Sequence, residues 1–319
     1  MGDEISADER AEIGASLVLL APPRQTNEVV KDVKVLAGQN SLIEGKILRS
    51  LLQYAMEQTI QVTLPGSSVN TLVTEHGHLG DGKFLCPRSH KSFRLDLFTH
   101  SVADVSSLRP DDCGGGSIKL EPWRAAIEDA LTGYMGQNFP SGAVSVFAPA
   151  DPKNPSIVIY VESSFQQNFR SGRWRSQWTL IIPDEIEGAV CQGSGEIRIQ
   201  THIFEEGNVQ LLSSKSFKFE VVAKSPEILG QEVCKKITEC DSDYQQAIGS
   251  NLTEMSSKCP RLTGIKLPPI RWAMNWRIPP PSLHPLLPLE VLLVTHSSLL
   301  PPLVLLFLLF SRTHSSRST

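Results

Sequence analysis

The sequence has none of the short motifs that mark the commonest enzyme active sites. Its 319 residues contain no P-loop, no G-x-G-x-x-G, no G-x-S-x-G and no H-E-x-x-H. These patterns would supply a phosphate cradle, a dinucleotide site, an activated serine and a catalytic zinc, respectively. No other grouping of nucleophile and base replaces them. We therefore expect a protein that is not an enzyme and that needs no cofactor.

The cysteines lack the spacing that is typical of metal or redox motifs. The six cysteines include no C-x-x-C pair, and the charged N-terminus does not resemble a secretory signal. We therefore expect reduced thiols in the cytoplasm. His76 and His78, beside Glu75, would face the same side of a strand and could hold a metal, but no further ligand cluster supports them. We expect a structural loop there and no metal site.

The chain also lacks the excess of positive charge that is typical of nucleic-acid-binding proteins. Its formal net charge is −4, so a nucleic-acid partner is not expected. Hydrophobic residues make up 40% of the sequence and charged residues 20%. With this composition and length, the chain can bury a sizeable core and is globular rather than disordered.

The most distinctive stretch is the run at 169–178, which contains two tryptophans and three arginines. Gly172 is expected to mark a turn, after which a strand begins. The period of two in a strand then separates the side chains onto two faces. One face carries Trp174, Ser176 and Trp178, and the other carries Arg173, Arg175 and Gln177. We expect buried indoles opposite a basic face that is solvated or turned toward a partner; a nucleic-acid surface is the alternative.

Helix and strand signals divide the chain into an α+β arrangement. Ser6 to Glu9 form a capping box, and Ser225-Pro226 starts a long helix. Apolar runs and turn signals at 142–222 predict an antiparallel meander of about five strands, with the long helix across it. The predicted order is a three-helix stalk at 1–58, a mixed strand and loop globule at 59–118, a helix plus the sheet at 119–224, the long helix at 225–257, a basic segment at 258–278 and a Leu/Pro/Ser-rich tail at 279–319.

Four separate motifs, in the right order, resemble the α subunit of the heterodimeric F-actin capping protein. Residues 172–178 match the family's N-G-R-W-R-S-x-W signature, with Ser171 in place of the asparagine. Further matches lie at 73–88, where Cys86 replaces an aspartate, at 204–211 and at 21–29. The signature residues are Glu75, His76, Gly77, Pro87, Arg88, Gly172, Arg173, Trp174, Arg175, Ser176 and Trp178.

The resemblance implies a fold, a function and two partners. Family members pair with a β subunit, share one antiparallel sheet with it, and cap the barbed ends of actin filaments without calcium or nucleotide. An antiparallel meander leaves two edges, and an unprotected edge invites pairing with another chain. The resemblance therefore implies a β subunit and the barbed end as partners, and the cytoplasmic actin cytoskeleton as the location.

Positive charge is concentrated in one segment near the C-terminal end. Residues 258–277 contain no Asp or Glu, which favours docking on an acidic protein surface; a solvated segment is the alternative. The resemblance implies an actin contact here, but Gly264 and Ile265 occupy the places of the family's arginine pair. The candidate actin-binding residues are Lys258, Arg261, Lys266, Arg271 and Arg277.

The resemblance ends after Trp276. The family continues with a short amphipathic helix that helps to hold the barbed end, whereas residues 279–281 are three prolines, which cannot lie inside a helix. We therefore expect weakened capping, and we interpret the tail at 279–319 as a product of splicing or of the gene model. The alternative is a non-capping heterodimer scaffold held at a membrane by residues 287–310, although Pro301-Pro302 would break a spanning helix there.

Overall fold

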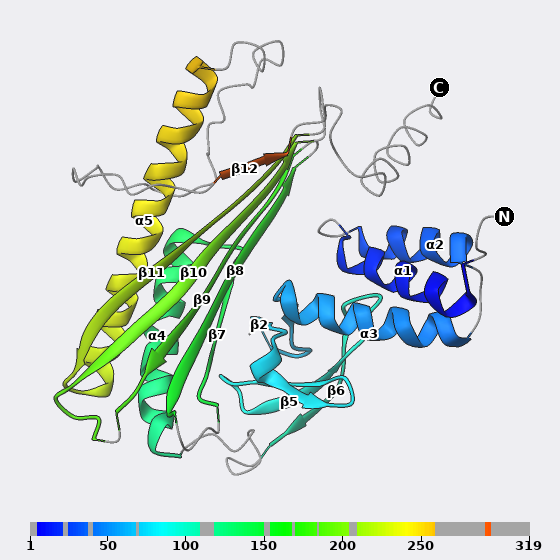
Figure 1. Ribbon diagram of the computed structural model, residues 1–319. Coiled ribbons are helices and arrows are strands. Elements are labelled where there is room, and N and C mark those ends of the chain that lie inside the picture. Colours follow the sequence, from blue (N-terminus) through cyan, green and yellow to red (C-terminus); the bar gives the residue numbers. More distant parts are fainter. Residues whose placement is uncertain are drawn as a thin grey trace.

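Helices and strands follow one another in an α+β order (Figure 1). The computed structural model describes residues 5–21, 25–37, 41–67, 70–108, 118–149, 154–167, 170–183, 185–203, 209–258 and 291–294. The helices are α1 (Ala7–Leu19), α2 (Thr26–Ala37), α3 (Ser41–Glu57), α4 (Glu121–Asn138) and α5 (Pro226–Lys258), with 3₁₀ turns η1 (Glu75–Gly77) and η3 (Ile118–Leu120). The strands are β1 (Gln61–Thr63), β2 (Asn70–Leu72), β3 (His78–Gly80), β4 (Lys83–Cys86), β5 (Lys91–Leu95), β6 (Val102–Ser107), β7 (Ala143–Phe147), β8 (Ser156–Gln167), β9 (Arg170–Ile181), β10 (Ala189–Ile203), β11 (Val209–Ala223) and β12 (Val291–Val294).

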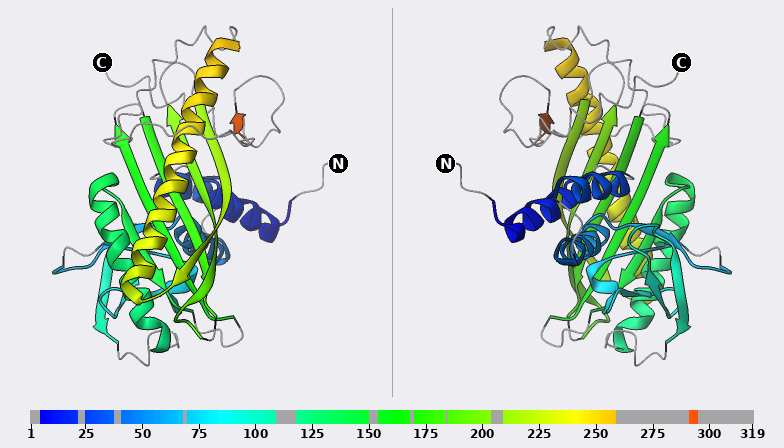
Figure 2. Two further views of the ribbon diagram at one scale, coloured as in Figure 1. Left: turned by 90° about the vertical axis from the view of Figure 1, so that its left-hand side faces the viewer. Right: turned by 90° about the vertical axis from the view of Figure 1, so that its right-hand side faces the viewer.

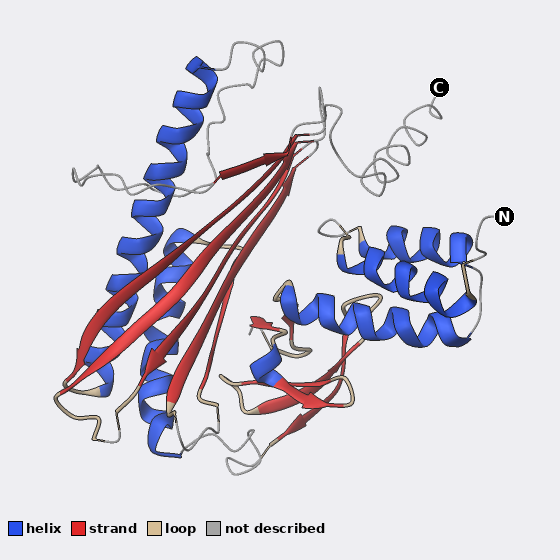
Figure 3. Ribbon diagram, viewed as in Figure 1, coloured by secondary structure: helices blue, strands red, loops and turns tan. Residues whose placement is uncertain are grey.

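The three N-terminal helices pack on one another at one end of the molecule, as expected (Figure 3). The predicted capping box starts α1, because the Glu9 amide donates to Ser6 Oγ at 3.2 Å and the Ser6 amide donates to Glu9 Oε2 at 2.9 Å. This pair of bonds satisfies two backbone donors that a helix end leaves free. Val18, Val33 and Ile47 are among the buried residues that hold the three helices together.

Two small sheets follow the helices. One is the pair β1–β2, and the other has the order β3-β4-β5-β6. Phe84 and Phe93 face each other across β4 and β5, with ring centroids 6.0 Å apart. They share a core with Tyr54 of α3, so the small sheets are attached to the last of the three helices.

The central sheet is an antiparallel meander in which β7 to β11 lie in sequence order, which confirms the predicted arrangement of about five strands. The longest pairing joins β10 and β11 over fifteen residues, Ala189–Ile203 against Val209–Ala223. Strand β9 lies at the centre of these five strands. It carries the tryptophans and arginines of the run at 169–178, which we call the Arg-Trp run. A short strand that the sequence did not predict, β12, adds to the outer edge of β11.

Helices α4 and α5 cover one face of this sheet, and α3 with the small sheets lies on the other (Figures 1 and 2). The long helix α5 runs diagonally across the strands, as expected from the sequence. Its N-cap is Ser225, whose Oγ accepts a hydrogen bond from the Ile228 amide at 3.3 Å. Within the described part of the chain, no helix is both long and apolar enough to cross a membrane.

The core beneath α5 contains a carboxyl group. Asp241 is 1% exposed, and its Oδ2 accepts a hydrogen bond from the Tyr134 hydroxyl of α4 at 2.8 Å. Burial raises the pKa of Asp241 to about 7, although hydrogen bonds from Tyr134 and Trp174 act in the opposite direction. The folded protein therefore holds this proton at a pH at which the unfolded chain has released it.

We predict that the substitution Asp241→Asn stabilises the protein more at pH 8 than at pH 5. Because the folded pKa lies above the unfolded value of 3.8, the stability contributed by the protonated carboxyl is complete below about pH 4 and is lost as the pH rises toward 7. Asparagine can still accept the Tyr134 hydrogen bond but does not ionise. Between pH 5 and pH 8 the difference in unfolding free energy between variant and wild type should grow by about 2–3 kcal/mol, measured by urea unfolding.

The matched control is Asp243→Asn, since Asp243 is an exposed carboxyl on the same helix. Its effect on stability should change little over the same pH range. A difference between Asp241→Asn and wild type that is the same at both pH values would contradict the assignment.

Candidate functional site

The tryptophans of the Arg-Trp run are buried, as the period of two predicted. Trp174 and Trp178 are each 1% exposed and point from β9 toward α4 and α5. The Trp174 ring lies 6.0 Å from Phe139 and 5.9 Å from Tyr244, centroid to centroid. Trp178 Nε1 donates to Ser176 Oγ at 2.9 Å, so the indole N–H is satisfied inside the core. This face of the signature is scaffold rather than a contact surface.

Of the two arginines that were expected on a solvated face, Arg173 is buried and Arg175 is partly buried. Arg173 is 8% exposed; its Nη1 donates to Gln58 Oε1 at 2.9 Å, and its Nε lies 3.3 Å from Glu162 Oε1. Arg175 Nη1 donates to the Glu57 carbonyl at 2.6 Å. Burial, together with the charges of Arg173 and Arg198, lowers the pKa of Arg175 to about 10. Both arginines therefore bind the C-terminal end of α3 to the sheet.

Gly172 lies inside β9 rather than in a turn, which corrects the prediction. It pairs with Phe165 of β8, and the Phe165 ring covers the place where a Cβ would stand. A glycine is required here because an aromatic ring from the neighbouring strand occupies its side-chain space.

The second signature, at 73–88, includes the turn η1, which follows β2. Thr74 caps this turn by accepting a hydrogen bond from the Gly77 amide at 3.2 Å. His76 Nδ1 lies 2.6 Å from the hydroxyl of Tyr160 on β8, so this loop is bound to the central sheet. Burial lowers the pKa of His76, and Glu75 opposes that shift. Among the described residues no group of three or more His, Cys, Asp or Glu is arranged to hold a metal ion.

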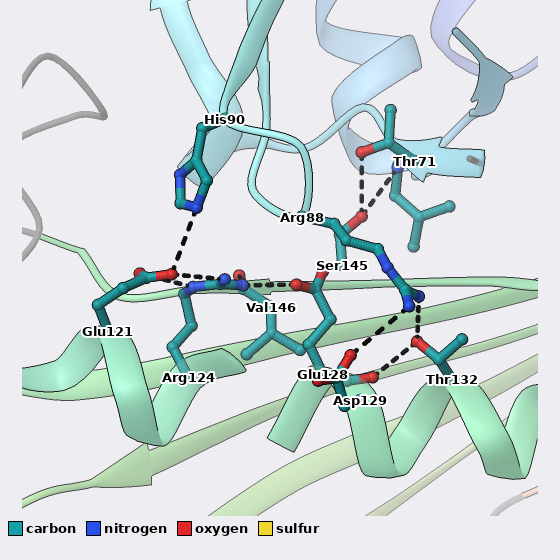
Figure 4. A network of polar contacts seen from close by, with 11 residues as sticks. Thr71, Arg88, His90, Glu121, Arg124, Glu128, Asp129, Thr132, Ser145 and Val146 are labelled. Atoms are coloured by element: carbon teal, nitrogen blue, oxygen red, sulfur yellow. Dashed lines mark hydrogen bonds and ion pairs between the residues drawn. The ribbon is translucent and has the colours of Figure 1, made fainter. Parts of the chain in front are cut away.

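Arg88 joins the turn after β4 to helix α4 (Figure 4). Its Nη1 donates to Thr132 Oγ1 at 2.7 Å, and its Nη2 lies 3.5 Å from Asp129 Oδ1. The neighbouring signature residue, Pro87, begins this turn. The signature residues at 75–88 therefore attach the globule to both the sheet and α4.

A buried ionic network that the sequence analysis missed lies beside Arg88 (Figure 4). Arg124 is 5% exposed; its Nη1 donates to Glu128 Oε2 at 2.6 Å and to the Val146 carbonyl at 3.1 Å. Its Nε and Nη2 donate to the two carboxylate oxygens of Glu121 at 2.8 and 2.7 Å. The spacing of Glu121, Arg124 and Glu128 along one helix face was the available signal, but it does not reveal burial.

A family model for the F-actin capping protein alpha subunit matches residues 15–278. The chain belongs to this family. Capping protein alpha subunits are not enzymes, which agrees with the lack of catalytic motifs. The resemblance inferred from four motifs is therefore confirmed.

Relatives from distant organisms match this chain over most of its length. The F-actin-capping protein subunit alpha of Caenorhabditis elegans is 33% identical over 277 residues, which cover 86% of this chain and 95% of the relative. That of Arabidopsis thaliana is 24% identical over 283 residues, which cover 86% and 90%. A solved structure, the homodimeric actin capping protein alpha subunit from Plasmodium berghei, has a TM-score of 0.67 at 19% identity and covers 82% of this chain and 98% of that chain. At this identity the likeness shows the fold alone.

The two edges of the central sheet differ. Strand β2 lies beside β7, where the Leu72 amide donates to Ser145 Oγ at 3.0 Å and Thr71 Oγ1 lies 3.2 Å from it (Figure 4). On the other side, β12 pairs with Gln210–Ser213 of β11. Within the described ranges, residues 214–223 of β11 have no strand on their outer side. We call residues 214–223 the free edge.

The candidate actin-binding residues lie at and beyond the end of α5. Lys258 is the last residue of that helix. Arg261, Lys266, Arg271 and Arg277 lie outside the described residues. The structure therefore places the start of the basic segment at the C-terminal end of a helix that is packed across the sheet.

We predict that the substitution Arg124→Met destabilises the protein by about 3–5 kcal/mol, because it leaves Glu121 and Glu128 without their buried partner. The matched control is Arg198→Met, which removes an arginine that is 61% exposed and paired with Glu196. That change should cost less than about 1 kcal/mol. Chemical unfolding of both variants provides the measurement, and equal losses would contradict the role of burial.

Proposed function

We propose that this chain is the alpha subunit of a heterodimer that caps actin filament barbed ends, without calcium, and blocks the exchange of actin subunits there. Family membership over residues 15–278 supports the proposal. The observation that carries it is the free edge, because a long strand with unpaired backbone groups is a template for another strand. The opposite edge of the same sheet is covered by β2.

The β subunit is the proposed occupant of the free edge. Pairing there would extend the five-strand meander into the joint sheet that the family resemblance implies. Phe217 and Phe219 on β11 are only partly buried against the core. A neighbouring strand would cover the exposed parts of these rings and remove apolar surface from water.

The proposed actin contact is the basic segment that begins at the end of α5. Its arginines and lysines would dock on the acidic surface of the terminal actin subunits, and this contact would weaken with salt. With such a contact, the proposed location of the protein is the actin cytoskeleton of the cytoplasm. The contact is reduced relative to the family because Gly264 and Ile265 replace an arginine pair and prolines at 279–281 replace the terminal helix.

We predict that the double variant Lys266→Glu/Arg271→Glu, co-purified with a β subunit, caps filaments with a Kd raised by about tenfold or more, since a loss of about 1.4 kcal/mol is a factor of ten. Elongation of pyrene-labelled actin from filament seeds measures this. The matched control is Lys31→Glu/Lys235→Glu, which reverses two exposed charges on α2 and α5. If both double variants cap as tightly as the wild type, the basic segment is not the actin contact.

A second prediction compares this heterodimer with one that contains a complete family alpha subunit. We expect this chain to bind the β subunit at normal stoichiometry and to cap less tightly, because the dimer-forming sheet is present and part of the actin contact is replaced. The same seeded assay, run at several heterodimer concentrations, gives both affinities. Equal affinities would contradict the proposed weakening and leave the heterodimer itself in place.

Self-association is a second candidate for the free edge. The Plasmodium berghei structure with the same fold is described as a homodimeric alpha subunit. Because every copy of the chain has the same free edge, two copies could pair through that edge alone, without any other contact surface.

A further inference from the structure

A polar pocket of about 500 Å³ lies where the N-terminal helices, the small sheets and the central sheet meet. Its wall combines Thr26 of α2 and Tyr54 of α3 with residues of β1, β8 and β9, and His100, between β5 and β6, lines it as well. The volume is in the range of small-molecule sites, which occur preferentially at junctions between structural units. None of the described residues of the free edge lines this pocket, so it is separate from the proposed β-subunit contact.

Two opposite charges are buried side by side in the pocket wall. Glu162 is 1% exposed and Arg173 is 8% exposed, and Glu162 Oε1 lies 3.3 Å from Arg173 Nε. Arg173 Nη1 also donates to Gln58 Oε1 at 2.9 Å, so the guanidinium is already engaged by the protein. The pair carries no net charge. An anionic ligand would meet the buried carboxylate and a cationic ligand the buried guanidinium, and either would lose its hydration in the pocket.

Two further titratable groups of the wall are uncharged at neutral pH. Burial lowers the pKa of His100, the charge of Arg173 acts in the same direction, and Asp96 opposes the shift. Burial raises the pKa of Tyr54, although the charge of Arg173 opposes this, so the hydroxyl keeps its proton. A neutral imidazole and a phenol can each donate and accept hydrogen bonds. They therefore suit a ligand that has hydroxyl groups rather than charges.

The remaining polar groups of the wall are amide and hydroxyl groups. Gln61, Ser141 and Ser164 line the pocket, and their side chains make no hydrogen bond to another described residue. All three are at least partly exposed, so a ligand can reach them from solvent. Phe165, which is also partly exposed, adds an apolar surface beside them. Several convergent donors and acceptors next to an aromatic ring fit a ring-shaped molecule with hydroxyl groups on its rim.

We infer that this pocket binds a small neutral molecule with several hydroxyl groups, of the monosaccharide or cyclitol class, through Gln61, His100 and Ser164. The bound molecule would contact the loop between β5 and β6, strand β1 and the central sheet at once. Because it binds only the folded chain, it would stabilise the junction between these units. The inference goes beyond capping and does not depend on it.

The test is ligand-observed saturation-transfer NMR on the full-length chain, with glucose, galactose, mannose and myo-inositol as neutral probes. At least one of them should bind with a millimolar or smaller dissociation constant. Glucuronate and glucosamine add one negative and one positive charge to the same kind of ring. Both should bind at least about tenfold more weakly than the best neutral probe, because each brings its charge beside a buried group of the same sign.

Two variants locate the binding. Ser164→Phe should abolish it by filling the pocket, and Gln61→Ala should weaken it about three- to tenfold by removing one hydrogen-bonding amide. The matched controls are Ser194→Phe and Gln192→Ala, at exposed positions of β10 outside this pocket, and both should bind like the wild type. Circular dichroism checks that each variant is folded. If Ser164→Phe does not fold, Gln61→Ala, at a partly exposed position, decides alone.

Three results overturn the inference: no neutral probe binds, a charged probe binds as tightly as the neutral ones, or the pocket variants bind like their controls. Each of these results leaves the proposed capping function in place, because the pocket shares no residue with the free edge or the basic segment.

Discussion

The burial of two indoles on the central strand is the constraint on which the rest of the structure depends. Trp174 and Trp178 occupy the middle strand of the five-strand meander and fill the space beneath α4 and α5. Because side chains alternate along a strand, fixing these indoles on one face sends Arg173 and Arg175 to the other. There the arginines bind the end of α3. A single strand therefore determines where the helices pack on one side of the sheet and where the N-terminal helices attach on the other.

The sequence predicted elements well where they were long and strongly patterned. The capping box at Ser6, the helix at Glu121–Asn138, the strand meander and the proline-started helix α5 all follow from local signals. Local sequence patterns predict which face of a helix or strand is apolar, but they do not predict which part of the chain covers the other face. Arg173 meets Gln58, which is 115 positions away in the sequence, so no periodicity could have shown that its charge is buried.

Gly172 illustrates the same difficulty at a single residue. A glycine before a strand is a normal turn signal. The predicted turn was wrong because the Phe165 ring of the neighbouring strand occupies the space where a side chain at position 172 would stand. Arg124 is a comparable case: its ionic partners were visible as helical spacing on α4, whereas the Val146 carbonyl that completes its burial belongs to strand β7. The candidate actin-binding residues follow from the positive charge of one segment and from the family resemblance, and all except Lys258 lie outside the described residues.

The position of α5 connects the two proposed interactions. This helix starts three residues after the free edge ends, at Pro226, and runs for 33 residues across the sheet to Lys258. At about 1.5 Å per residue it spans about 50 Å. Leu229, Val233, Ile237 and Tyr244 are buried along it, so the packed part of the helix is held rigidly against the strands. A partner on the free edge and an actin contact at the end of α5 would therefore be held by one rigid unit. Capping by such a unit depends on two binding surfaces that are held at fixed positions relative to each other, and it involves no chemical reaction.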